Sequence, residues 1–228
     1  MNKICTDRIK CIYVSSEAQE ELTAALTGLA DRVITVSPRG ITYPAVDAHP
    51  DMYYCKMGVT RHCHIFAGDP AELGTAYPEN IRFNAVCLDG YFIHNLKHTS
   101  PALLREAQAK GLECIHVRQG YTKCSCVVVD GYSLITSDEG IIHTLQGYTD
   151  IHVLKIRPGF VQLPGFPYGF LGGASGRVGH EILFHGDLAA HPDHEAIRRF
   201  IVERGLAVRD FPQHPLRDIG SILADEGG

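Results

Sequence analysis

The chain has 228 residues, of which 45% are hydrophobic and 21% charged, and this ordinary globular composition excludes a disordered protein. The formal net charge of −5 argues against general electrostatic binding to nucleic acid or to an anionic membrane. No apolar run approaches the ~20 residues of a membrane-spanning helix, and the N-terminus lacks the apolar segment of a signal peptide. We therefore expect a single domain over residues 1–228, located in the cytoplasm, without a nucleic-acid or membrane partner.

Five helical segments recur along the chain, and most are followed by a short run typical of a β-strand. They are expected to begin near Ser16, Asp69, Ser100, Ser137 and Asp193. In the first segment Leu22, Leu26 and Leu29 recur at the spacing of one helix face. Strand-like runs follow at 32–36, 114–117, 151–154 and 206–208. This alternation indicates an α/β fold.

A hairpin pattern precedes the later helices. The segments 86–93 and 127–135 each hold two apolar runs around an Asp-Gly pair, which is a strong hairpin signal. The segment 182–188, with Gly186 in its middle, is a looser third copy. The sequence therefore predicts about five units in the order strand, turn, strand, helix, strand.

Units of this size cannot bury both faces alone, so stacking or ring closure is expected. The pattern resembles the pentein (α/β-propeller) superfamily, which includes the guanidino-group modifying enzymes and a ribosome anti-association factor. The run Leu-Ala-Ala-His-Pro-Asp at 188–193 resembles a strand–His-Pro-Asp–helix step of that factor. The resemblance implies five units around a pseudo-fivefold axis, whose polar loops meet at a central channel.

The guanidino-modifying enzymes attack the guanidinium carbon with a thiolate, use a histidine as acid and base, and hold the cation with carboxylates. Here His49 and Asp51 resemble their His-X-Asp loop, and residues 172–175 resemble the Gly-rich loop that precedes the catalytic cysteine. No cysteine follows that loop, because the last one in the chain is Cys126. The nucleophile of the family is therefore missing from its usual place.

The candidate residues come from the polar segments expected at the channel. The chain has eight cysteines and no export signal, so the thiols are expected to be reduced. The catalytic candidates are His49, Asp51, Cys124 and Cys126, and the ligand-binding candidates are Asn84, Ser175 and Arg177.

Each candidate group also has a purely structural interpretation. His-Pro-Asp recurs at His191, where it is typical of a turn with a capping aspartate. Cys124 and Cys126 would share one face of a strand and pack in the core. The glycines at 172–176 either cradle an anion beside Arg177 or form a tight turn.

His62, Cys63 and His64 offer ligands suited to zinc, but their spacing matches no standard zinc module and an edge strand also explains them. We therefore expect no metal or cofactor. The sequence favours a central channel that binds a small polar or cationic compound, with chemistry related to guanidino or amidine groups. The alternative is a noncatalytic binding or assembly protein on the same scaffold, and the sequence assigns no oligomeric state.

Overall fold

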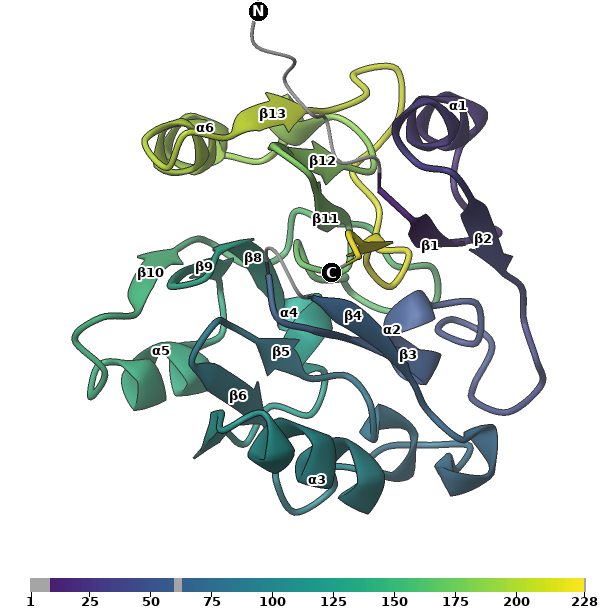
Figure 1. Ribbon diagram of the computed structural model, residues 1–228. Helices are drawn as coiled ribbons and strands as arrows, with labels where there is room; N and C mark the ends of the chain where they lie inside the picture. Colours follow the sequence, from purple (N-terminus) through teal and green to yellow (C-terminus); the bar gives the residue numbers. More distant parts are fainter. Residues whose placement is uncertain (1–8, 60–62, 228) are drawn as a thin grey trace, which may run out of the picture.

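Short strands in five small sheets make up this mixed α/β fold, with the longer helices outside the sheets and short single-turn helices toward the middle (Figure 1). The computed structural model describes residues 9–59 and 63–227. Its strands are β1 (Cys11–Ser15), β2 (Val33–Val36), β3 (Tyr54–Met57), β4 (His64–Ala67), β5 (Val86–Cys87), β6 (Tyr91–His94), β7 (Glu113–His116), β8 (Cys126–Asp130), β9 (Ser133–Thr136), β10 (His152–Lys155), β11 (Ser175–Val178), β12 (Glu181–Phe184), β13 (Ala207–Arg209) and β14 (Leu223–Asp225). The α-helices are α1 (Glu20–Leu29), α2 (Pro50–Tyr53), α3 (Pro101–Ala109), α4 (Thr122–Ser125), α5 (Glu139–Leu145) and α6 (His194–Val202). Single 3₁₀ turns are η1 (Pro70–Glu72), η2 (Glu79–Ile81) and η3 (Leu188–Ala190).

Four of the sheets share one connectivity, in which an antiparallel pair is followed by a helix and by a third strand parallel to the second. The runs β5-β6-α3-β7, β8-β9-α5-β10 and β11-β12-α6-β13 follow it consecutively. In the fourth sheet the C-terminal β14 pairs antiparallel with β1, and α1 and β2 follow β1. The two ends of the chain thus complete one sheet, while β3 and β4 form the fifth.

The Asp-Gly hairpins were predicted correctly in two places. Val86 pairs with Ile93 around Asp89-Gly90, and Val127 pairs with Ile135 around Asp130-Gly131. The third hairpin was placed wrongly, because β11 and β12 turn at residues 179–180 and Gly186 instead follows β12. The apolar run at 182–184 is therefore a single strand of a pair whose partner, β11, is rich in small residues.

The helix expected from Asp69 is shortened to the single 3₁₀ turn η1. Asp69 does cap it, since its Oδ1 accepts the N–H of Ala71 at 2.9 Å. Gly74, two residues beyond η1, packs against Glu79 so closely that a Cβ would lie 2.2 Å from its Oε2. The chain turns there instead of continuing a helix.

The helices cover the outer faces of the sheets with their apolar sides. Leu22 and Leu26 of α1 are fully buried beside β1, and Ile197 and Ile201 of α6 are fully buried in the cluster that contains β12 residues. One edge strand of each sheet lies toward the middle of the molecule (Figure 1). These strands contact one another in the order β8, β11, β14, β3 and β5. Within the described residues, no helix combines the length and the apolar character of a membrane span.

The loop before α2 is held by one buried carboxylate. The oxygens of Asp47 accept the four consecutive backbone N–H groups of residues 39–42 at 2.5–3.1 Å and the hydroxyl of Tyr53 at 2.7 Å. Burial raises the pKa of Asp47, but these hydrogen bonds outweigh it and lower the pKa to about 2. The loop that leads to His49 is therefore fixed by an ionised aspartate.

We expect Asp47→Asn to lower the free energy of unfolding by about 2 kcal/mol at pH 7, since hydrogen bonds to a charged group are lost. The contribution of Asp47 is fully present above the ordinary pKa of 3.8 and disappears as the pH falls toward 2. Urea unfolding at pH 7 and at pH 3 measures it, and the difference between the two proteins should shrink at pH 3. Asp69→Asn, at the exposed cap of η1, is the matched control with little effect. An equal loss at both pH values would contradict this account.

Candidate functional site

His49 and Asp51 stand at the start of α2, where Pro50 occupies the first turn. Both side chains are buried, at 1% and 0% exposure. Neither caps the helix, so the capping interpretation of this His-Pro-Asp does not apply. At the second copy Asp193 stands at the N-cap position of α6, but its side chain does not cap that helix, so the expected capping aspartate is wrong there too; it accepts hydrogen bonds from the backbone N–H and the guanidinium of Arg157. The same three residue types thus point inward at one place and bind a surface arginine at the other.

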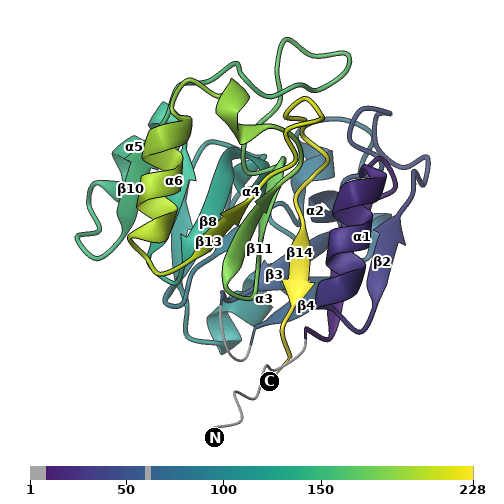
Figure 2. The ribbon, with the colours of Figure 1, turned by 90° about the horizontal axis from the view of Figure 1, so that it is seen from above.

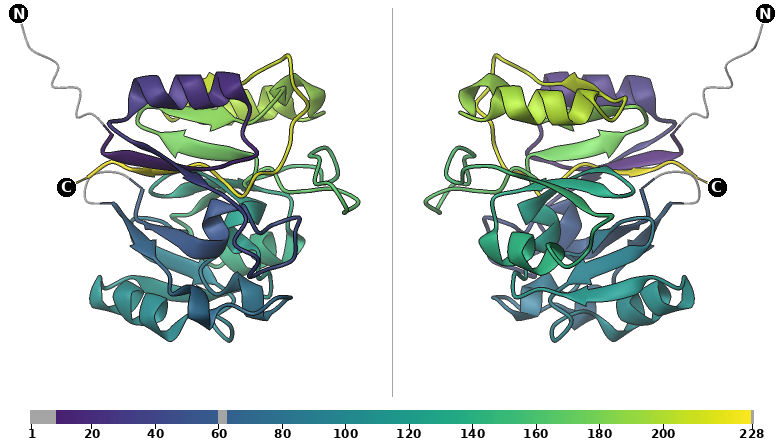
Figure 3. Two further views of the ribbon diagram at one scale, coloured as in Figure 1. Left: turned by 90° about the vertical axis from the view of Figure 1, so that its right-hand side faces the viewer. Right: turned by 90° about the vertical axis from the view of Figure 1, so that its left-hand side faces the viewer.

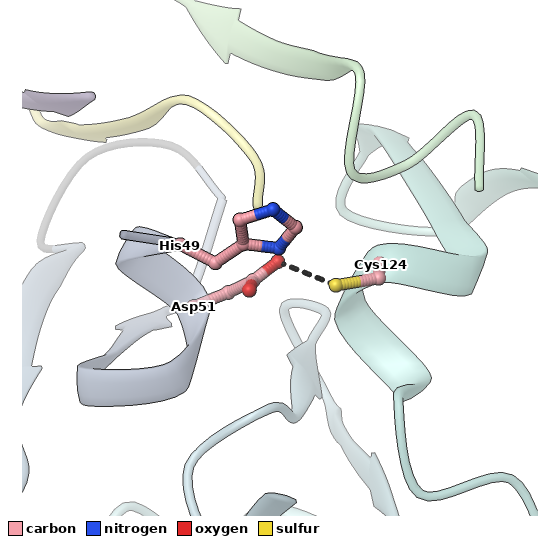
Figure 4. Close-up of side chains that lie close together, drawn as sticks. All are labelled: His49, Asp51 and Cys124. Carbon is pink, nitrogen blue, oxygen red and sulfur yellow. Dashed lines mark hydrogen bonds between the residues drawn. The ribbon is translucent and has the colours of Figure 1, made fainter. Parts of the chain in front are cut away.

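Cys124 lies on the short helix α4 and points at Asp51 (Figure 4). Its Sγ donates to Oδ2 of Asp51 at 3.0 Å and accepts from Nδ2 of Asn84 at 3.3 Å. The Oδ1 atom of Asn84 accepts the backbone N–H groups of Lys123 and Cys124 at 2.8 and 3.2 Å. Asn84 therefore fixes both the start of α4 and the position of the thiol.

The C-terminal segment supplies two further polar residues that the sequence analysis missed, Asp218 and Ser221. Ser221 Oγ donates to Oδ2 of Asp51 at 2.7 Å. Asp218 accepts the backbone N–H groups of Phe170 and Gly220 at 2.9 and 3.0 Å. The run Asp-Ile-Gly-Ser at 218–221 was the available signal, because Gly and Asp so close together typically mark a tight turn.

Gly220 is required where it stands. Its φ is +74°, and a Cβ on it would lie 2.1 Å from the Cβ of His49. A side chain would therefore be strained and would displace the imidazole. The C-terminal segment and the start of α2 can approach each other only because this position is glycine.

His49 is a neutral imidazole with unused hydrogen-bonding capacity. Burial lowers the pKa of His49, and among the described residues neither ring nitrogen has a hydrogen-bond partner. Oδ1 of Asp218 lies 3.8 Å from Nδ1 of His49. Burial raises the pKa of Asp218 to about 6. Such a histidine is available for a proton or for a ligand.

The thiol of Cys124 is protonated in the free protein. Burial, together with the negative charges of Asp51 and Asp218, raises its pKa well above the ordinary value. Burial raises the pKa of Asp51, and the hydrogen bonds from Cys124 and Ser221 to its Oδ2 act in the opposite direction. Lys123 is the nearby cation, and its Nζ donates to Ser221 Oγ at 3.1 Å. A change in local charge therefore controls whether the thiolate forms.

A pocket of about 300 Å³ opens onto this group. His49, Cys124 and Asp218 form its buried end, since none is more than 3% exposed. The rest of the lining is aromatic or apolar and consists of Tyr43, Val46, Tyr121, Leu163, Phe166, Pro167, Tyr168 and Phe170. An apolar cleft with a few convergent polar groups is the usual form of a small-molecule site.

The remaining predicted residues lie elsewhere. Cys126 begins β8 in a hydrophobic core cluster, where burial raises its pKa to about 12. It does not share a strand face with Cys124, because α4 ends between them. Ser175 Oγ donates to the carbonyl of Gly172, and Arg177 donates to the carbonyl of Val129. None of these three residues lines the pocket.

The Gly-rich segment packs closely against α4 and does not cradle an anion. A Cβ on Gly172 would lie 2.4 and 2.5 Å from the carbonyl oxygens of Cys126 and Cys124. The carbonyl of Gly172 accepts from Nζ of Lys123 at 3.4 Å, so it faces a cation. This segment therefore forms the tight turn that was the structural interpretation of its glycines.

The proposed zinc ligand His62 lies outside the described residues. Of its neighbours, Cys63 is buried, and Nε2 of His64 lies 3.3 Å from Oε1 of Glu106. Within the described part of the chain, the potential metal-ligand group is instead His49, Asp51 and Cys124, whose ligand atoms lie within 4.8 Å of one another.

Comparison with known protein families matches residues 13–223 to a family of unknown function, DUF6873. The chain belongs to this family. No curated protein matches it. Among solved structures it is similar to the crystal structure of a dimethylarginine dimethylaminohydrolase adduct with 4-chloro-2-hydroxymethylpyridine, with a TM-score of 0.51 and 11% identity over 89% of this chain and 92% of that one. At this identity the likeness concerns the fold alone, and it agrees with the predicted α/β fold.

We expect iodoacetamide to label Cys124 slowly at pH 8, because most of this thiol is protonated in the free protein. Asp51→Asn removes the nearest negative charge and should accelerate labelling several-fold by lowering the thiol pKa. Peptide mass spectrometry across pH 6–10 gives the rate for each cysteine. Asp193→Asn, which removes a carboxylate paired with Arg157, serves as the control without effect. Half-maximal labelling of Cys124 below about pH 8.5, the ordinary thiol value, would contradict the assignment.

Proposed function

We propose that this protein is an enzyme that acts on a small guanidinium or amidinium compound, with the Cys124 thiol as its nucleophile. One observation carries the proposal: the Cys124 thiol, the Asp218 carboxylate and an imidazole without a hydrogen-bond partner among the described residues line the buried end of one pocket, and Asp51 is hydrogen-bonded to the thiol. The likeness to the fold of a dimethylarginine dimethylaminohydrolase adds support. The nucleophile would stand in the middle of the chain instead of after the Gly-rich segment.

The carboxylates provide the binding of the cation. Asp218 lies at the pocket end, and its oxygens are bonded only to backbone N–H groups among the interactions of the described residues. A bound cation would be attracted to Asp218 and Asp51, and its positive charge would lower the pKa of Cys124. The substrate itself thus completes the activation of the thiol.

The chemistry then needs one proton carrier. Neutral His49 takes the proton from Cys124, and Sγ attacks the central carbon of the cation to form a C–S bond. The imidazolium returns that proton to the departing nitrogen as the C–N bond breaks. Water next adds to the same carbon with His49 as base, the C–S bond breaks, and the thiol is restored. The net change is the hydrolysis of one C–N bond with release of ammonia or an amine.

Asp51 and Asn84 position the thiol. Asp51 fixes the position of Sγ through the 3.0 Å hydrogen bond, while the Nδ2 donor of Asn84 stabilises negative charge on sulfur. Both side chains are fully buried, so their hydrogen bonds are not weakened by water.

We also infer that the five sheets surround a pseudo-fivefold axis as a propeller. The adjacency of β8, β11, β14, β3 and β5 in that order supports it. In such a ring the site would draw residues from several units, as His49, Asn84, Cys124 and Asp218 do here. The alternative of a noncatalytic binding or assembly protein would use the same pocket without turnover.

The test is turnover of a panel of guanidinium and amidinium compounds, followed by release of ammonia or amine. Cys124→Ser and His49→Gln should each lower the rate at least about a hundredfold, because each removes a reacting group. Cys114→Ser, at a partly exposed cysteine outside the pocket, should leave the rate unchanged. Turnover that survives Cys124→Ser would overturn the proposal, and binding without any turnover would favour the noncatalytic alternative.

A second candidate function is metal-dependent hydrolysis at the same residues. His49, Asp51 and Cys124 offer the nitrogen, oxygen and sulfur ligands that zinc accepts, and their ligand atoms lie within 4.8 Å of one another. The buried Oδ1 of Asp51 and both ring nitrogens of His49 lack hydrogen-bond partners among the described residues. Three protein ligands beside a pocket would leave the fourth position to water.

Elemental analysis after incubation with zinc and desalting decides between the two candidates. The metal candidate predicts one zinc per chain, lost in His49→Ala, and activity abolished by a chelator. His64→Ala, which removes a histidine paired with Glu106, is the control that retains the metal. The absence of stoichiometric zinc together with chelator-resistant turnover would remove the metal candidate and leave the thiol mechanism.

A further inference from the structure

The pocket has one polar, negatively charged end and one apolar, exposed end, and this asymmetry defines the ligand class. Resting on the proposed function, we propose that the pocket selects a monocation that carries an apolar substituent and discriminates against amino-acid-like compounds with a free carboxylate. The carboxylate at the buried end favours a cation, and the apolar side chains at the mouth favour an apolar substituent. The lining contains no lysine or arginine that could pair with a carboxylate of the ligand.

The charge balance favours a single positive charge. Asp218 is the one carboxylate in the pocket lining, and Asp51 is hydrogen-bonded to Cys124 outside that lining. Nζ of Lys123 donates to Ser221 Oγ and to two carbonyl oxygens, and Lys123 does not line the pocket. The carboxylate of Asp218 therefore has no cationic side chain beside it in the pocket lining. A monocation neutralises it, whereas a neutral ligand leaves it buried and unpaired.

The lining offers no cation to a ligand carboxylate. Its eleven residues, all within the described chain, include Asp218 and no lysine or arginine. The hydroxyls of Tyr43 and Tyr121 lie 2.8 Å apart and bond to each other, and that of Tyr121 also bonds to Asn80. A carboxylate bound here would lose its hydration without gaining an ionic partner, and it would be repelled by Asp218.

The mouth of the pocket suits an apolar substituent. The segment between β10 and β11 extends from the body of the molecule (Figures 2 and 3) and carries Phe166 and Tyr168, which are 47% and 43% exposed. Phe166 packs on Tyr43 with ring centroids 5.6 Å apart. Exposed aromatic side chains beside a polar pocket end gain burial when an alkyl group covers them. Aromatic rings also attract a cation that passes over them.

The volume limits the size of that substituent. A volume of about 300 Å³ lies at the lower end of the range of ~300–1,000 Å³ that is typical of small-molecule sites. The pocket therefore holds a guanidinium or amidinium group with a short alkyl or small aryl substituent. The probe compound that fits these conditions is butylguanidinium.

Isothermal titration with the Cys124→Ala protein tests the proposal without turnover. Butylguanidinium should bind at least tenfold more tightly than butylurea, its neutral counterpart of similar shape, and at least tenfold more tightly than arginine. Asp218→Asn should abolish the preference for butylguanidinium over butylurea. Arginine binding as tightly as butylguanidinium, or butylurea binding equally well, would overturn the proposal.

Two variants at equally exposed phenylalanines test the role of the apolar mouth. Phe166→Ala should weaken butylguanidinium several-fold and leave methylguanidinium unchanged, because only the longer compound reaches the ring. Phe160→Ala removes an equally exposed phenylalanine of the same segment, but Phe160 packs against His191 and does not line the pocket. It should change neither affinity. An equal effect of Phe166→Ala on both compounds would contradict the role of the mouth.

Binding and turnover measured together distinguish failure of the ligand class from failure of the enzyme proposal. If butylguanidinium binds with the stated preferences but no panel compound is turned over, the enzyme proposal fails and the ligand class stands. If turnover depends on Cys124 but arginine is preferred, the enzyme proposal stands and the ligand class fails.

Discussion

The hydrogen bond between the Cys124 thiol and the Asp51 carboxylate is the interaction on which this site depends. A buried carboxylate is costly unless it is bonded, and here one oxygen accepts from both Cys124 and Ser221 while Lys123 donates to Ser221. These bonds join three distant parts of the chain, namely α2, α4 and the C-terminal segment. The close approach of that segment at Gly220 brings Asp218 beside His49.

The same constraint explains why the free protein would be unreactive. Negative charge near Cys124 raises the pKa of its thiol, and burial lowers the pKa of His49, so neither residue carries a charge in the empty pocket. A cation at Asp218 changes this balance and favours the thiolate. Reactivity would therefore depend on the ligand, which protects a buried thiol from neutral electrophiles and from oxidation.

Local patterns made much of the fold predictable from the sequence. Asp89-Gly90 and Asp130-Gly131 marked two hairpins because an Asp-Gly turn needs only its own two residues. The third hairpin was misplaced because β11 is short and rich in small residues, and its true turn at 179–180 lacks an Asp-Gly pair. The unit of two antiparallel strands, a helix and a parallel strand followed from these repeats, and a solved structure shares the overall fold.

The site was harder to predict, for physical reasons. His49 and Asp51 were found because a His-X-Asp motif is local, whereas Asp218 and Ser221 reach them through long-range contacts, namely the pairing of β14 with β1 and backbone hydrogen bonds of residues 218–222 to distant segments. Cys124 and Cys126 could not be separated, since a single helical turn such as α4 is too short to show a helical period. Arg177 and Ser175 looked polar and available, but their hydrogen bonds go to backbone carbonyls.

The central claim is that Cys124 becomes a nucleophile when a cation occupies the pocket. The most direct measurement compares chloroacetamidine, which is cationic, with chloroacetamide, which is neutral and of nearly the same size, by mass spectrometry of each cysteine-containing peptide. The account predicts that the cationic reagent modifies Cys124 at least about tenfold faster than the neutral one, and that Asp218→Asn removes this preference. Equal rates for the two reagents at Cys124, or faster modification of another cysteine by the cationic one, would contradict it.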